Sequence, residues 1–180
     1  MVSDDAKEKM KNRKTPIASF YANLMTFDGY YEKKWFPYTM PISDIYGLRA
    51  AFNLIAGDKT LYERHARIGS ATRAAVKEAG LKLHLQSGYS NTVTVFDIPE
   101  CTDAKSILDE MRTKYNIMLA GSFDELSGKV IRIGHMGENA RLEHMVPALE
   151  ALSATLTDLG VTLQGNLADL FLKHYREFQD

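Results

Sequence analysis

Cysteine is nearly absent from this sequence of 180 residues, and neither sign of charge is in excess. The single cysteine, Cys101, excludes an internal disulfide and a cysteine-based metal cage, so nothing requires an oxidising compartment. The 22 basic and 23 acidic residues give a formal net charge of −1, whereas nucleic-acid-binding proteins carry a basic excess. No two of the five histidines lie three or four residues apart. We therefore expect no metal site and no nucleic-acid partner.

Long hydrophobic runs are also missing. No apolar run approaches the length that spans a bilayer, and the charged residues 1–7 do not resemble a signal peptide. Hydrophobic residues make up 45% and charged residues 25% of the chain, which is typical of a globular protein and not of a disordered one. These features predict a soluble, cytoplasmic protein without a membrane partner.

Periodicity and capping residues predict helices and short strands in alternation. Helices are expected over residues 3–13, 43–57, 58–79, 103–115, 139–159 and 167–178. Strands are expected over residues 81–85, 92–98, 117–120 and 129–133. From residue 58 onward this order predicts an α+β domain, with a short, mostly antiparallel sheet covered by helices. The aromatic stretch 30–38 is expected to be irregular, and residues 1–57 to be part of something larger.

Arg132 is the strongest candidate for a binding residue. Alternation along its strand places Val130 and Arg132 on one face and Ile131 and Ile133 on the other. The strand ends at Gly134, where side chains can meet a cleft, and the planar guanidinium suits bidentate binding of a carboxylate. The alternative is an arginine on the solvated face of an edge strand, which spacing alone favours.

Two loop residues are weaker candidates. Thr39, between Pro37 and Pro41, could present its hydroxyl to a phosphate or cap the next turn. His135, in a loop flanked by glycine, could titrate near a site or hold the loop in place.

Five stretches keep a characteristic order and spacing: residues 37–51, 80–83, 92–94, 98–99 and 128–137. The most specific part reads Arg132-Ile133-Gly134-His135-Met136-Gly137. Together with residues 7–14 and 20–21, they resemble the second half of the class V, fold-type I aminotransferases, which use pyridoxal phosphate. The alanine–glyoxylate and serine–pyruvate type is the most similar group.

The resemblance implies roles for particular residues. Arg132 would bind the α-carboxylate of the substrate, and Thr39 would donate to the cofactor phosphate of the opposite subunit in a homodimer. Residues 1–57 would be the tail of the large α/β cofactor domain with its interface loop, and residues 58–180 the small C-terminal domain. Phe36 stands where many relatives carry a tyrosine that also reaches the phosphate.

The resemblance also implies a missing group. The family transfers an amino group between an amino acid and a 2-oxo acid such as glyoxylate or pyruvate, through a lysine that forms a Schiff base with the cofactor. No lysine of this chain occupies such a motif, so we expect no catalytic residue here, no covalently bound cofactor and no activity without a complementing N-terminal portion. The alternatives are a stand-alone carboxylate-binding module and a structural module that dimerises through residues 20–46.

Overall fold

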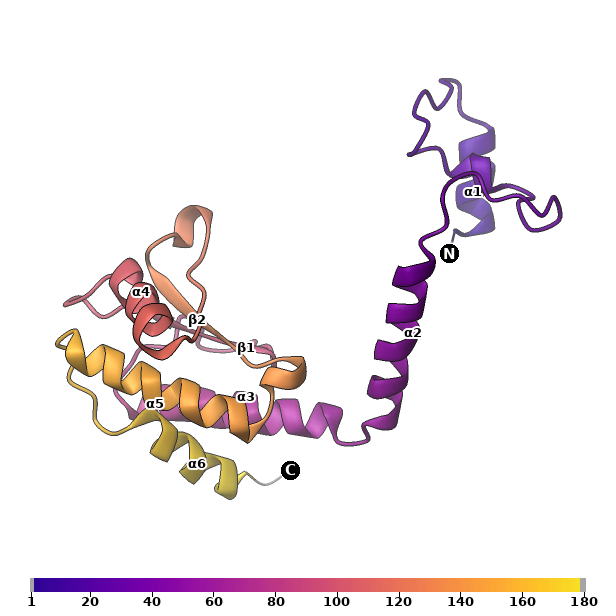
Figure 1. Ribbon diagram of the computed structural model, residues 1–180. Coiled ribbons are helices and arrows are strands. Elements are labelled where there is room, and N and C mark those ends of the chain that lie inside the picture. Colours follow the sequence, from indigo (N-terminus) through magenta and orange to yellow (C-terminus); the bar gives the residue numbers. More distant parts are fainter. Residues whose placement is uncertain (1, 179–180) are drawn as a thin grey trace. The chain divides into compact units, whose positions relative to one another are not determined.

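The computed structural model describes residues 2–178, and the chain divides into two units between Gly57 and Asp58. The first unit holds helices α1 (Asp4–Lys11) and α2 (Ile42–Gly57) and a 3-10 turn, η1 (Leu24–Phe27) (Figure 1). The second unit holds strands β1 (Val93–Asp97) and β2 (Val130–Gly134) and helices α3 (Leu61–Glu78), α4 (Ala104–Tyr115), α5 (Leu142–Asp158) and α6 (Leu167–Glu177). Two further 3-10 turns are η2 (Asp124–Leu126) and η3 (Gly137–Asn139).

The described part of the first unit has no buried residue. Helix α1 begins after Ser3, whose side chain accepts a hydrogen bond from the backbone of Ala6, as the sequence predicts. Residues 30–38 form turns and bends, as expected, and their aromatic rings join those of Phe20, Tyr21 and Phe27 in a series of edge contacts. This unit is therefore held by local contacts and not by a hydrophobic core.

Helix α2 exposes apolar side chains around its circumference. Ile45, Tyr46 and Leu54 are each about half exposed or more, and their spacing along the helix places them on different sides of it. Helices that are apolar on all sides are typical of positions surrounded by protein.

A two-stranded antiparallel sheet is the centre of the second unit. Its register pairs Val95 with Arg132 and Phe96 with Ile131. Single bridges extend it on both sides, one from Leu83 to Phe96 and one from Ala120 to Arg132. The expected strands 81–85 and 117–120 are therefore one bridging residue each. The alternation of apolar residues predicts which side chains face the core. It does not predict the hydrogen bonds between strands, because these depend on how far a neighbouring segment runs alongside the strand.

Two predicted helix starts are also wrong. Ser43 lies inside α2, because the backbone of Ile45 already donates to Pro41 and the helix begins at Ile42. Asn139 does not open α5 but ends the separate turn η3, and α5 begins three residues later.

The core of the second unit lies between one face of the sheet and the helices. Phe96, Ile131 and Ile133 are buried there with Ile68 of α3 and Phe171 of α6. Helix α6 packs against α3 and α5, and α4 packs against α5. The predicted α+β class is confirmed. Among residues 2–178, no helix combines the length and apolarity needed to cross a bilayer.

Candidate functional site

Arg132 lies in the middle of the paired region and not at an edge. Its backbone pairs with Val95 of β1 on one side, and on the other its N–H donates to the carbonyl of Ala120 at 2.7 Å. Ile131 and Ile133 face the core, so Arg132 lies on the opposite face, as alternation predicts. The structure does not favour the alternative of a solvated edge-strand arginine, because a single bridge to Ala120 covers the outer side of β2 at this residue and Arg132 is half-buried.

Two contacts hold the guanidinium of Arg132. Its Nε donates a hydrogen bond to the carbonyl oxygen of Gly121, and its central carbon lies 5.1 Å from the ring centroid of Phe123. No carboxylate within residues 2–178 lies within ion-pair distance of it. A half-buried cation without an internal counter-charge is suited to an external anion.

A cleft of about 630 Å³ opens beside Arg132. Its walls are residues 117–120, the end of β2 with Met136, and the first half of α5, including Glu143, His144 and Pro147. Most of this lining is apolar, which lowers the competition from water for a bound acid. A larger groove between α5 and residues 160–166 contains Glu150 and Asp158 and no cationic side chain, so it is not suited to an acid.

His135 is fully buried at the end of β2. Its Nδ1 donates to the carbonyl oxygen of Asn91 at 3.2 Å, so its Nε2 is the acceptor for the hydroxyl of Thr94 at 2.8 Å. Burial lowers the pKa of His135 from 6.5 to about 4. The structure therefore shows His135 as a neutral imidazole that holds the loop in place, which is one of the two roles expected from the sequence.

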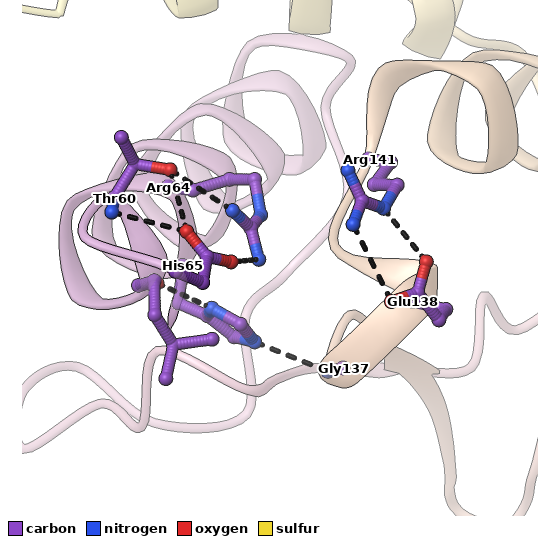
Figure 2. A network of polar contacts seen from close by, with 8 residues as sticks. Thr60, Arg64, His65, Gly137, Glu138 and Arg141 are labelled. Carbon is purple, nitrogen blue, oxygen red and sulfur yellow. Dashed lines mark hydrogen bonds and ion pairs between the residues drawn. The ribbon is translucent and has the colours of Figure 1, made fainter. Parts of the chain in front are cut away.

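Gly137, two residues after His135, is held by a histidine of α3. His65 Nδ1 lies 2.6 Å from the carbonyl oxygen of Leu61 and donates to it, and the N–H of Gly137 donates to His65 Nε2 at 3.1 Å (Figure 2). In the sequence, His65 lies inside the helix expected over residues 58–79. No local signal could reveal this contact, because the two partners are 72 residues apart.

The start of α3 is fixed by ionic and hydroxyl contacts. Arg64 lies 2.7 Å from the carboxylate of Asp58, and Thr60 donates to the same carboxylate from its N–H and its hydroxyl (Figure 2). The hydrogen bonds from Arg64 and Thr60 lower the pKa of the Asp58 carboxyl to about 2. Helix α3 thus presents His65 to the loop from a well-anchored first turn.

Thr39 lies in the first unit, three residues before α2, and its side chain is exposed. The neighbouring Tyr38 hydroxyl donates to the carbonyl oxygen of Phe20 at 2.6 Å, which ties the loop to the aromatic contacts. Within the described residues, no hydrogen bond engages the Thr39 hydroxyl, so it is available to a ligand. Arg132 belongs to the second unit.

No cluster of histidine, cysteine, aspartate and glutamate that could hold a metal ion occurs within residues 2–178.

No protein-family model matches the chain. The serine–glyoxylate aminotransferase of Methylorubrum extorquens is 36% identical over 165 residues, which cover 87% of this chain and 40% of that enzyme. The crystal structure of the pyridoxamine–pyruvate aminotransferase from Mesorhizobium loti matches with a TM-score of 0.83 at 31% identity, over 98% of this chain and 46% of that one. The ureidoglycine–glyoxylate aminotransferase of Bacillus subtilis matches with a TM-score of 0.85 at 30% identity, over 97% and 46%.

The chain belongs to the class V aminotransferases. The resemblance inferred from the motifs is confirmed. This class V aminotransferase chain spans less than half of the length of the relatives it matches.

Class V aminotransferases depend on pyridoxal phosphate, which a lysine holds as a Schiff base. Such a lysine becomes a good nucleophile when it is desolvated or lies next to another cation. In this chain every lysine side chain is exposed, including Lys7, Lys9 and Lys11 on α1, and none lines the cleft beside Arg132. The residues present do not fit covalent attachment of the cofactor, although Arg132 fits a carboxylate.

Proposed function

We propose that this chain is the C-terminal portion of a pyridoxal-phosphate-dependent aminotransferase. The complete enzyme would move an amino group between an amino acid and a 2-oxo acid such as glyoxylate or pyruvate. The observation that carries the proposal is Arg132, a half-buried residue that lines a largely apolar cleft and has no carboxylate within ion-pair distance among residues 2–178. In this role Arg132 binds the α-carboxylate that amino acids and 2-oxo acids share.

The proposal assigns different parts of the enzyme to the two units. Residues 58–180 form the small C-terminal domain, and residues 1–57 the tail of the large cofactor domain. The exposed apolar side chains of α2 support the second assignment, because they need covering by protein. The covering surface would come from the remainder of the enzyme and from a second subunit.

Thr39 is the proposed contact to the cofactor phosphate, in the site of the opposite subunit. Its free hydroxyl lies just before the N-terminus of the 16-residue helix α2, where a helix favours an anion. Phe36, nearby in the same loop, has no hydroxyl to add. We propose that this chain alone binds a carboxylate but is inactive, because no lysine is placed to hold the cofactor covalently.

Carboxylate binding is tested with the complete 180-residue chain. Pyruvate is titrated into isotope-labelled protein while the backbone amides of residues 119–136 are followed by NMR. We expect shifts at Ala120 and Arg132–Gly134, and a loss of affinity of about ten-fold or more in Arg132→Gln, since hydrogen bonds to charged groups contribute about 1.5–3 kcal/mol. Arg112→Gln is the matched control, because Arg112 lies on α4 and pairs with Asp109. Equal pyruvate affinity in Arg132→Gln and wild type would overturn the assignment.

Inactivity is tested by incubating the chain with pyridoxal phosphate, reducing with borohydride and locating any added mass on its lysines. We expect partial, scattered modification, because all the lysines are similarly exposed. Complete modification of one lysine would show that the chain holds the cofactor itself. A stand-alone binding module would also bind a carboxylate without catalysing a reaction. The two proposals are distinguished by adding a partner protein that carries the cofactor: restored transamination supports the aminotransferase fragment.

A further inference from the structure

The guanidinium of Arg132 is held on two of its sides. A bidentate carboxylate can approach an arginine either along the edge that contains Nε or along the edge formed by the two Nη atoms. In this chain Nε already donates to the carbonyl oxygen of Gly121, which occupies the first edge. The central carbon of the group lies over the ring of Phe123, 5.1 Å from the ring centroid.

The contact with Gly121 follows from the pairing of the backbone. Ala120 and Arg132 exchange both of their backbone hydrogen bonds, N–H to carbonyl at 2.7 and 3.4 Å. The residue after Ala120 is therefore brought beside the Arg132 side chain, and its carbonyl oxygen turns toward Nε. The sheet, and not a flexible side chain, thus provides the acceptor.

Phe123 does not contribute to the hydrophobic core. Its side chain is 72% exposed, and it lies directly before η2. The next two residues, Asp124 and Glu125, carry carboxylates, but neither comes within ion-pair distance of Arg132. The main contact of the Phe123 ring is therefore with the guanidinium of Arg132.

We propose that Gly121 and Phe123 are positioning residues, which aim Arg132 so that it binds the substrate carboxylate end-on, through its two Nη atoms. This inference rests on the proposed function for the identity of the ligand, a small 2-oxo acid. Fixing the group before binding reduces the rotamer entropy lost when the acid arrives. It also leaves the apolar walls of the cleft to receive the remainder of the acid.

NMR of the arginine side chain tests the geometry in the complete chain. In the free protein we expect the Nε–H of Arg132 to exchange slowly with water, because it is bonded to Gly121. On addition of pyruvate the Nη resonances should shift while the Nε resonance stays in place. A shift of Nε with loss of its protection would show side-on binding and overturn the proposal.

The role of Phe123 is tested by substitution. Phe123→Ala should weaken pyruvate binding about two- to five-fold, the size expected of a cation–π contact at an exposed site. Phe123→Leu should weaken pyruvate binding by a smaller factor. Tyr62→Leu is the matched control, an exposed aromatic of the same unit on α3. Unchanged affinity in Phe123→Ala overturns this inference alone. If pyruvate does not bind wild type at all, both this inference and the proposed function are wrong.

Discussion

Mild acid should destabilise the second unit through the burial of His135. The imidazole is fully buried and donates from Nδ1 to a backbone carbonyl, while Nε2 accepts from Thr94. Protonation would place an uncompensated charge in the core and turn the acceptor into a donor. Burial therefore lowers the pKa of His135 to about 4 in the folded protein, against 6.5 for the exposed group.

The sign and size of the effect follow from the two pKa values. Between pH 6.5 and pH 4 the unfolded chain binds a proton at this histidine and the folded chain does not, so the free energy of unfolding falls as the pH falls. From pH 7 to pH 5 the loss is about 2 kcal/mol, and it levels off near about 3 kcal/mol below pH 4. Such a loss is a large part of the stability of an ordinary domain.

Urea unfolding at a series of pH values, followed by far-UV circular dichroism, measures the effect. Circular dichroism detects the helices of the second unit, whereas Trp35, the single tryptophan, lies in the first. His135→Asn removes the titrating group, and His144→Asn is the control at an exposed histidine of α5. We expect the loss between pH 7 and pH 5 to be about 2 kcal/mol smaller in His135→Asn than in wild type or the control. Parallel pH profiles for all three proteins would refute the reasoning.

Two substitutions in the helices test the packing of the second unit. Gly69→Ala should destabilise it by about 1–3 kcal/mol, because the new Cβ would lie 3.2 Å from the Cα of Asn91, a backbone atom with little freedom to move. Thermal unfolding of this variant at the wild-type midpoint would contradict that close approach. Ser153→Ala should cost about 1–3 kcal/mol, because the buried hydroxyl accepts from the backbone of Leu167 at 2.8 Å and would leave that N–H unpaired. Hydrogen exchange at the start of α6 should then accelerate, and an unchanged rate at Leu167 would argue against it.

The sequence predicted the face of β2 that carries Arg132, because side chains alternate strictly along a strand. It could not predict that the outer side of β2 is bridged at Arg132. The bridge from Ala120 to Arg132 is one residue long, and its formation depends on where the segment after α4 returns to the sheet. The same bridge brings Gly121 to the guanidinium. The hydrogen bond from Arg132 Nε to Gly121 therefore depends on strand pairing, which apolar periodicity in the sequence does not predict.

The assignments of Thr39 to a phosphate and of Arg132 to a carboxylate stay predictions. The sequence motifs suggested them, and the structure adds that Thr39 is exposed and that Arg132 lines a cleft. That this chain alone does not hold the cofactor covalently also stays a prediction, and every lysine side chain in the chain is exposed.

By itself, the sequence determined the class V membership, the α+β class and the face of β2 that carries Arg132, because motif spacing, capping and apolar periodicity are local properties of the chain. The tertiary structure alone decided that His65 accepts from Gly137, that His135 is buried as a neutral imidazole and that Gly121 occupies the Nε edge of Arg132. Each of these contacts joins residues 11 to 72 positions apart, and such contacts form only when distant elements pack together.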